Sequence, residues 1–412
     1  MLNRRDFLKY AGVLGLSPYL AKVSWASDKN VVVIGGGAAG VIAANYLKRL
    51  VPALSITLID KNSEYKPAFA NNLKLNALLP TTTHNFTYKK LQTNGISFIK
   101  DEVSAIDPEK NVISLASGKK INFDRAILAP GVSVKQSEIP GAENIVTSWN
   151  ASENIDNFHS RLKTMEQGGT VLLSSPAGEI SGAWAVYERA SQIAQWCAEH
   201  NKTAKIILLS GNKAPDEIDL FQHAWNVLYP GKIDTVFNES ISEIKGQQAI
   251  SKSGALKFSV ANLIPSNNCN NLIVNSGLAE VRHWCKVTPG SFTHEKYKNI
   301  HVLGDNVDSS LGLSKTAQSA NAQAKNCAIA IANEIAGRNL FNDMIPMIDS
   351  HYAIIGKDYA VSSTRIFKVD STGKMNLLEK GQSAVNASEK QHQREAQYAL
   401  SWYKNITGEM FS

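Results

Sequence analysis

The chain has 412 residues, of which 43% are hydrophobic and 19% are charged, so it is long enough for two or three domains with ordinary buried cores. The formal net charge of +7 is modest, and +3 of it lies within the first 26 residues, which argues against a nucleic-acid-binding protein. The four cysteines lie far apart, without a C-x-x-C or C-x-x-C-H motif, which argues against structural zinc or another bound metal, and against covalently attached c-type haem.

The first 26 residues have the pattern of an export signal. A twin arginine, Arg4-Arg5, precedes a short and weakly apolar run over 10–20, and small residues at Ser24 and Ala26 mark a cleavage site after Ala26. The run is about half of the roughly 20 residues that a membrane-spanning helix needs. We therefore expect a twin-arginine signal peptide over residues 1–26 and a periplasmic location without a transmembrane segment.

A nucleotide-binding pattern follows. The β-branched run 30–34 predicts a buried parallel strand, which leads through Gly35-Gly36-Gly37-Ala38-Ala39-Gly40 into a helix. In this context the first glycine permits a tight turn, the third lets the backbone approach a pyrophosphate, and the last lets the helix pack on the strand. A second strand, 55–60, ends in an acid that is placed to bind a ribose hydroxyl. The predicted dinucleotide contacts here are Gly35, Gly37, Ala39, Gly40, Asp60 and Lys61.

Two further segments favour FAD as the dinucleotide. Segments 95–99, 111–115 and 121–128 predict a β-meander that returns to a buried strand, and another buried strand, 299–303, ends in Gly-Asp. Both patterns resemble elements of the flavoproteins with two dinucleotide-binding domains, in which the Gly-Asp aspartate binds the ribityl and pyrophosphate region of FAD. A helix over about 315–330 would direct its N-terminal dipole at the flavin. A turn cap is the alternative role for the aspartate. The predicted FAD contacts here are Ala129, Gly131, Gly304, Asp305, Lys315 and Thr316.

Over nearly its full length the chain resembles the flavoprotein subunit of flavocytochrome c sulfide dehydrogenase. The resemblance is carried by the glycine motif and by Tyr187-Glu188-Arg189-Ala190-Ser191-Gln192, Trp284-Cys285, Gly304-Asp305, Lys315 with Ser319-Ala320-Asn321, and the tail 394–403. It implies an α/β fold with two Rossmann-like domains, the FAD-binding one at 27–149 with 271–340 and the second at 150–270, and a small C-terminal α+β interface domain at 341–412. It also implies oxidation of sulfide or a related sulfur compound at a cysteine pair beside FAD, with electrons passed to a separate c-type cytochrome subunit.

Two positions depart from the family pattern. Ala68 stands where the family tethers its flavin through a cysteine, so we expect noncovalent FAD. Gly182 stands where one redox cysteine is expected, whereas Cys285 is retained. A disulfide relay needs two sulfurs, so Cys285 is predicted to act as a single catalytic thiol unless Cys269 or another cysteine lies within bridging distance. A buried packing role is the alternative for Cys285, and it is the favoured role for Cys197 and Cys327.

The remaining segments bear on the electron donor and acceptor. The second predicted Rossmann start, 174–179, lacks the glycine spacing, so NAD(P)H is not the expected donor. Glu179 and Glu188 are candidates for proton handling or helix caps. Three roles are open for the aromatic residues of the tail, which are Tyr398, Trp402 and Tyr403: covering the flavin, contacting a cytochrome or filling a local core. Two other functions stay open: quinone reduction, against which the charged C-terminal helix argues, and a non-catalytic flavin electron-transfer subunit.

Overall fold

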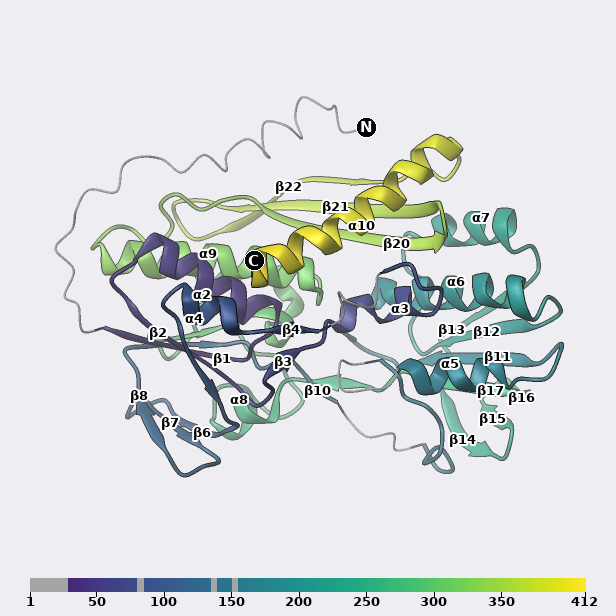
Figure 1. Cartoon of the computed structure of the whole chain (residues 1–412), viewed down its shortest axis with the longest axis horizontal. Coiled ribbons are helices and arrows are strands. Elements are labelled where there is room, and N and C mark those ends of the chain that lie inside the picture. Colours follow the sequence, from purple (N-terminus) through teal and green to yellow (C-terminus); the bar gives the residue numbers. More distant parts are fainter. Residues whose placement is uncertain (1–28, 80–84, 135–138, 150–154) are drawn as a thin grey trace.

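The computed structural model describes residues 29–79, 85–134, 139–149 and 155–412, so the predicted signal peptide lies outside the described residues. Two α/β units lie side by side, and an antiparallel sheet with the C-terminal helix lies along both of them (Figure 1).

The first unit is built on a five-stranded parallel sheet in the order β19-β9-β1-β2-β5. Its strands are β1 (Asn30–Ile34), β2 (Ser55–Asp60), β5 (Ser97–Lys100), β9 (Arg125–Leu128) and β19 (Ile300–Val302). The predicted meander is therefore shorter than expected, because 97–100 joins the parallel sheet. Within the predicted segment, β6 (Val103–Asp107), β7 (Val112–Leu115) and β8 (Lys120–Asn122) pair as an antiparallel meander.

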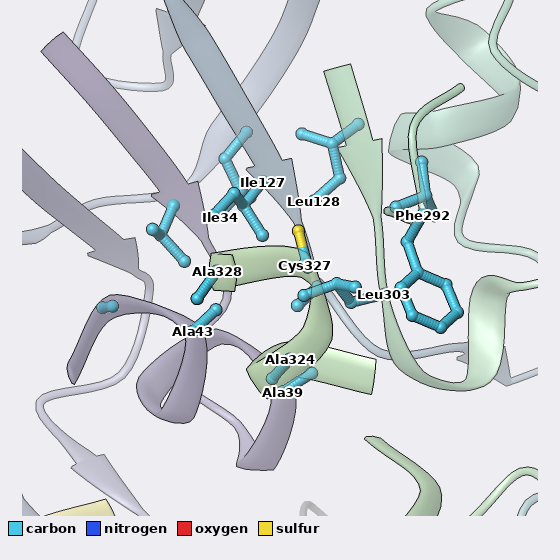
Figure 2. Close-up of a cluster of buried hydrophobic side chains, with 14 of the residues drawn as sticks. Ile34, Ala39, Ala43, Ile127, Leu128, Phe292, Leu303, Ala324, Cys327 and Ala328 are labelled. Atoms are coloured by element: carbon cyan, nitrogen blue, oxygen red, sulfur yellow. The ribbon is translucent and has the colours of Figure 1, made fainter. Parts of the chain in front are cut away.

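Two helices, α2 (Ala38–Leu50) and α9 (Ala317–Ile335), pack together against this sheet. Small side chains line their contact, so the helices approach each other closely. Figure 2 shows Ala39, Ala43, Ala324 and Ala328 at this contact, with Cys327 directed toward Ile127 and Leu128 of β9. The Cys327 thiol is fully buried, in agreement with the predicted packing role, and burial raises its pKa.

The second unit has a four-stranded parallel sheet in the order β13-β12-β11-β17. Its strands are β11 (Thr170–Ser175), β12 (Lys205–Ser210), β13 (Ile233–Phe237) and β17 (Val260–Leu263), and its helices are α5 (Ile155–Lys163), α6 (Ala183–His200) and α7 (Ile218–Leu228). A small antiparallel sheet of β14 (Ile241–Lys245), β15 (Gln248–Ser251) and β16 (Gly254–Lys257) is inserted before β17. Cys197 of α6 is buried in the core of this unit. The predicted pair of Rossmann-like domains is confirmed.

The C-terminal segment forms an antiparallel sheet of β20 (Met347–Gly356), β21 (Tyr359–Val369) and β22 (Met375–Gln382), followed by α10 (Glu389–Phe411). Strand β20 contacts both α6 and α9, so this sheet bridges the two α/β units. None of the helices in the described residues is long and apolar enough to cross a membrane. The short elements are β3 (Glu64–Tyr65), η2 (Ala68–Ala70), α3 (Asn71–Lys74), β4 (Phe86–Thr87), α4 (Lys89–Thr93), β10 (Ser133–Val134), β18 (Asn267–Asn268), α8 (Asn271–Asn275), η4 (Gly304–Asn306) and η5 (Ser309–Leu311).

Candidate functional site

The glycine turn between β1 and α2 is tightly packed on one side and open on the other. Gly35 has φ +100°, and a Cβ there would lie 2.1 Å from the carbonyl oxygen of Ala129. A Cβ at Gly40 would lie 1.9 Å from the carbonyl oxygen of Gly35. At Gly37, the N-cap of α2, the nearest described atom to a Cβ would be 3.9 Å away, in the Tyr65 ring. The N-terminus of α2 is therefore approachable there by an anionic group.

Asp60 at the end of β2 faces this turn. Its carboxylate accepts hydrogen bonds from the backbone N–H of Gly36 at 2.6 Å and of Asn62 at 2.7 Å. Ala39 is buried in the first turn of α2, beside Gly304. Lys61 is exposed, and its ammonium lies 3.8 Å from the Glu102 carboxylate. Asp60 is thus fixed at the turn, whereas Lys61 is a surface residue.

The second half of the predicted site is fixed by amide side chains that the sequence did not single out. Gly131 has φ +72°, and no described atom would lie within 4 Å of a Cβ there. Its carbonyl accepts hydrogen bonds from the side-chain amides of Asn270 and Asn306, both at 3.0 Å. The N–H of Gly304 donates to the Gln323 side chain at 2.7 Å. The sequence signal from which this network could have been predicted is the asparagine-rich stretch 267–271.

Asp305 lies where the two α/β units meet. The Ser181 hydroxyl, from the second unit, donates to its carboxylate at 2.5 Å. Burial raises the pKa of Asp305, while the Ser181 hydrogen bond and the Lys315 charge act in the opposite direction. Asn267 accepts from the Ser181 backbone N–H at 2.8 Å, and its buried Nδ2 has no partner within the described residues. A ligand with acceptor atoms would satisfy this amide.

Lys315 is a buried ammonium directly before α9. It donates to the carbonyl oxygens of Asp305 at 2.8 Å and Val307 at 2.9 Å, and it lies 3.5 Å from the Glu179 carboxylate. The ammonium also lies 3.6 Å from the ring centroid of Trp284. Burial lowers the pKa of Lys315, and the charges of Glu179 and Asp305 oppose that shift.

Thr316 is the N-cap of α9, because its hydroxyl accepts from the Ser319 N–H at 3.2 Å. The carbonyl of Lys315 accepts from the N–H of Gly182, the N-cap of α6, at 2.8 Å. The N-terminal ends of α6 and α9 are therefore joined at one point.

These residues fit FAD. The open turn at Gly37, with Asp60 and the N-terminus of α2, would hold the ADP half through backbone N–H groups and one carboxylate. Asp305, the unpartnered amide of Asn267 and the N-terminus of α9 would hold the ribityl chain and the flavin ring.

The retained thiol lies in a packed environment. Cys285 is fully buried, its Sγ lies 3.3 Å from the carbonyl oxygen of Leu278, and burial raises its pKa to about 12. Burial also raises the pKa of Cys269 to about 11, against the Lys315 charge and the backbone N–H groups of Asn270 and Cys285. Cys269 lies near Cys285, because the backbone N–H groups of Asn270 and Cys285 both donate to Asn306, each at 2.8 Å. All four cysteines lie in the described ranges, and each is a free thiol. The surroundings favour packing, and the catalytic role of Cys285 stays a prediction.

The Tyr-Glu-Arg segment connects the units of the fold. The Glu188 carboxylate accepts from the Ile354 N–H at 2.9 Å and from the Asn72 amide at 2.8 Å, and burial raises its pKa to about 7. Arg189 is 1% exposed, and it donates to the side chains of Asn72 at 2.5 Å and Asn262 at 2.7 Å. The two side chains link α6 to α3, β17 and β20.

The aromatic residues of the tail are used in different ways. Tyr403 is buried against Phe69, with ring centroids 5.7 Å apart. Trp402 also packs on Phe69, and its indole N–H donates to Gln318 in the first turn of α9. Tyr398 is 55% exposed. One aromatic therefore fills a local core, one contacts α9, and one is available at the surface.

Three family profiles match the chain. A pyridine nucleotide-disulphide oxidoreductase domain matches residues 29–172, the central domain of the sulfide dehydrogenase (flavocytochrome c) flavoprotein chain matches 156–265, and the flavin-binding domain of flavocytochrome c sulphide dehydrogenase matches 350–411.

Similar proteins include the mitochondrial sulfide:quinone oxidoreductase of Dictyostelium discoideum, which is 22% identical over 312 residues covering 71% of this chain and 68% of that protein. The sulfide-quinone reductase of Aquifex aeolicus is 34% identical over 163 residues, 36% of this chain and 35% of that one. The crystal structure of the sulfide:quinone oxidoreductase from Aquifex aeolicus superposes with a TM-score of 0.72 at 18% identity, covering 92% of each chain, which shows the shared fold. Because the central and flavin-binding domains are both matched, the comparisons support the flavocytochrome c sulfide dehydrogenase flavoprotein family for this chain.

Proposed function

We propose that the chain is a periplasmic oxidoreductase that holds FAD noncovalently, oxidises sulfide or a related sulfur compound, and passes the electrons to a c-type cytochrome. The observation that carries the proposal is the match of two domains specific to the sulfide dehydrogenase flavoprotein around a site that fits FAD. Ala68 supports noncovalent binding, because its methyl group cannot form a thioether to the flavin.

The chain's own residues prepare the site for a group that becomes negatively charged. Bound FAD would supply the redox chemistry, which is acceptance of two electrons from the donor and their release one at a time. The N-terminus of α9 and the buried Lys315 ammonium place positive charge beside the site, which stabilises the reduced state. The Ser181 hydroxyl orients the Asp305 carboxylate. Because Ser181 and Asp305 come from different units, this hydrogen bond also joins the two units beside the site.

The test is anaerobic. The exported protein is purified, its FAD is released by acid to confirm noncovalent binding, and the flavin absorbance is followed after sulfide is added to wild type and to Cys285→Ala. Bleaching in wild type is the expected result, and its absence would overturn sulfide as the donor and favour the electron-transfer subunit. Loss of bleaching in Cys285→Ala would establish the single-thiol role, whereas full bleaching would leave Cys285 as a packing residue.

Quinone is the second candidate acceptor, favoured by the similarity to the Dictyostelium discoideum sulfide:quinone oxidoreductase. The sulfide-reduced protein is mixed separately with a c-type cytochrome and with a short-chain ubiquinone. Under the proposal the cytochrome reoxidises the flavin at least tenfold faster. A faster reaction with the quinone would reverse the assignment of the acceptor.

The periplasmic location is tested through the arginine pair. Replacement of both Arg4 and Arg5 by lysine should retain the chain, with its uncleaved first 26 residues, in the cytoplasm. Export of that variant at the wild-type level would contradict the twin-arginine signal.

A further inference from the structure

A polar cluster that the FAD site does not use lies between α6, α9 and the C-terminal sheet. It consists of Ser314, Asp349, His351 and Arg365. The Asp349 side chain is fully buried, and one of its oxygens, Oδ2, accepts from the Ser314 hydroxyl at 2.8 Å and from Arg365 at 2.7 Å. Arg365 also donates to the Ser314 hydroxyl oxygen at 2.6 Å. His351 Nε2 lies 2.8 Å from the same oxygen.

The hydrogen bonds of Ser314 fix the tautomer of His351. A serine hydroxyl has one proton to donate and two lone pairs. That proton goes to the Asp349 carboxylate, since otherwise two acceptor oxygens would face each other at 2.8 Å. The two lone pairs then accept from Arg365 and from His351, so Nε2 of His351 carries a proton. Nδ1 is left as an acceptor, without a hydrogen-bond partner in the described part of the chain.

The cluster is also prepared for a protonated His351. The second carboxylate oxygen of Asp349, Oδ1, is buried without a hydrogen-bond partner among the described residues and lies 3.8 Å from His351 Nε2. A positive charge on the imidazole ring would be stabilised by this carboxylate. Burial lowers the pKa of His351, the charges of Asp349 and Glu217 raise it, and the charge of Arg365 lowers it. Burial is the largest of these effects, so the pKa of His351 lies below its ordinary 6.5. The ring is therefore neutral at neutral pH and able to accept a proton.

The cluster lies beside the flavin half of the site. Ser314 directly precedes Lys315 and the N-cap of α9. On its other side, the His351 ring lies against Trp184 in the first turn of α6, with the ring centroids 5.4 Å apart. The N-termini of α6 and α9 are joined by the hydrogen bond from Gly182 to Lys315. The His351 side chain is 14% exposed, so the ring is not sealed from a small donor.

We propose that His351 is the proton acceptor of the flavin-linked oxidation, with Ser314, Asp349 and Arg365 as positioning residues. This inference rests on the proposed function with sulfide as the donor. Two hydrosulfide ions would form one hydrogen disulfide ion: one S–S bond forms, one S–H bond breaks, FAD, when bound, would be the two-electron oxidant, and the proton passes to Nδ1 of His351. A second hydrosulfide ion accepts the sulfur in this reaction, so no cysteine pair is needed.

The test uses His351→Gln in the FAD-loaded protein. Glutamine retains an amide N–H for the Ser314 hydroxyl and removes the base at Nδ1. The rate of anaerobic bleaching by sulfide is measured between pH 5 and 8 for wild type, His351→Gln and His200→Gln. The control residue, His200, is exposed at the far end of α6. Acid-released FAD per chain is measured for every variant, and ionisation of sulfide affects all of them alike.

We expect the bleaching rate of His351→Gln at pH 7.5 to fall by about 10²- to 10⁴-fold, the usual contribution of a general base. We also expect a shallower decline in rate on the acid side than in wild type and His200→Gln, because His351→Gln keeps only the decline that is due to sulfide ionisation, with FAD content unchanged. Bleaching of His351→Gln at the wild-type rate and with the wild-type pH profile would overturn the role of His351 and leave the proposed function intact. Absence of bleaching in wild type would overturn both.

A second readout does not depend on turnover. In wild type labelled at histidine, the resonance that His351→Gln removes is followed against pH by NMR. Replacing Asp349 with asparagine should lower the pKa of that resonance, because the carboxylate stabilises the imidazolium. An unchanged pKa would contradict the pairing of His351 with Asp349.

Discussion

The two glycines at the turn before α2 provide a matched pair of substitutions that separates folding from FAD binding. Gly37 has φ −83° and ψ −170°, which any residue adopts, and a Cβ there would have its nearest described neighbour at 3.9 Å. Gly37→Ala should therefore change the free energy of unfolding of the FAD-free protein by no more than about 0.5 kcal/mol. If the pyrophosphate approaches this backbone, the added methyl group prevents one charge-assisted hydrogen bond. Such a bond contributes about 1.5–3 kcal/mol, so the Kd for FAD should rise about 10- to 100-fold.

Gly35→Ala should instead destabilise the fold of the FAD-free protein. A residue with a side chain at φ +100° is strained by about 1–3 kcal/mol, and the new Cβ would lie 2.1 Å from the carbonyl oxygen of Ala129. Ala129 donates its own N–H to Ile34 at 2.8 Å, so relief of the clash would disturb the pairing of β1 with β9. We expect a lower melting temperature in the FAD-free state. FAD titration by flavin fluorescence and thermal melts by circular dichroism measure the two effects. Wild-type affinity in Gly37→Ala, or wild-type stability in Gly35→Ala, would refute this reasoning.

Four further predictions follow from buried polar groups and thiols. Arg189→Ala should lower the free energy of unfolding by about 3–5 kcal/mol in urea titrations, because it leaves the buried acceptor oxygens of Asn72, Ser148 and Asn262 unpaired, and Arg189→Lys should recover only part of that loss. The pKa of Glu188, about 7 in the fold against an ordinary 4.5, means that protonated Glu188 stabilises the native state. That contribution is complete below pH 4.5 and lost as the pH rises through 7, so over this range wild type should lose stability relative to Glu188→Gln; parallel pH profiles would contradict it. Ser181→Ala should raise the Kd for FAD about tenfold, whereas Ser160→Ala, at an exposed position of α5, should not. A thiol reagent such as DTNB should modify the cysteines only slowly until denaturant is added, because all four are buried; rapid modification of the native protein would contradict their burial.

The glycine turn could be predicted from the sequence because each of its parts is local. Gly35, Gly37 and Gly40 lie within one strand-turn-helix unit, and Asp60 ends the neighbouring strand of the same sheet. Periodicity placed the buried strands for the same reason, and the expected charged C-terminal helix is observed over Glu389–Phe411. The assignment of 95–99 to the meander was wrong because pairing with β2 depends on tertiary contacts.

The groups that complete the site could not be predicted because they meet across long stretches of chain. Ser181 and Asp305 are 124 positions apart and belong to different units. Ser314, Asp349 and Arg365 come from the loop before α9 and from two strands of the C-terminal sheet. No periodicity or short motif reports such contacts. The Tyr-Glu-Arg segment was recognised by resemblance alone, and only the structure shows that its charged side chains connect α6 to α3, β17 and β20.

The connection between β11 and α6 explains why the second Rossmann-like unit matters for the site of the first. In the first unit the helix begins four positions after the strand ends, at Ala38 after Ile34, whereas α6 begins eight positions after Ser175. The longer connection brings Glu179 to Lys315, Ser181 to Asp305 and the Gly182 N–H to the Lys315 carbonyl, and Trp184 follows against His351. The N–H at the start of α6 thereby donates to a carbonyl oxygen of the first unit, whereas in a dinucleotide site such N–H groups bind a pyrophosphate. The second unit therefore supplies side chains around the N-terminus of α9, and a change in this connection should alter the flavin environment before it alters either parallel sheet.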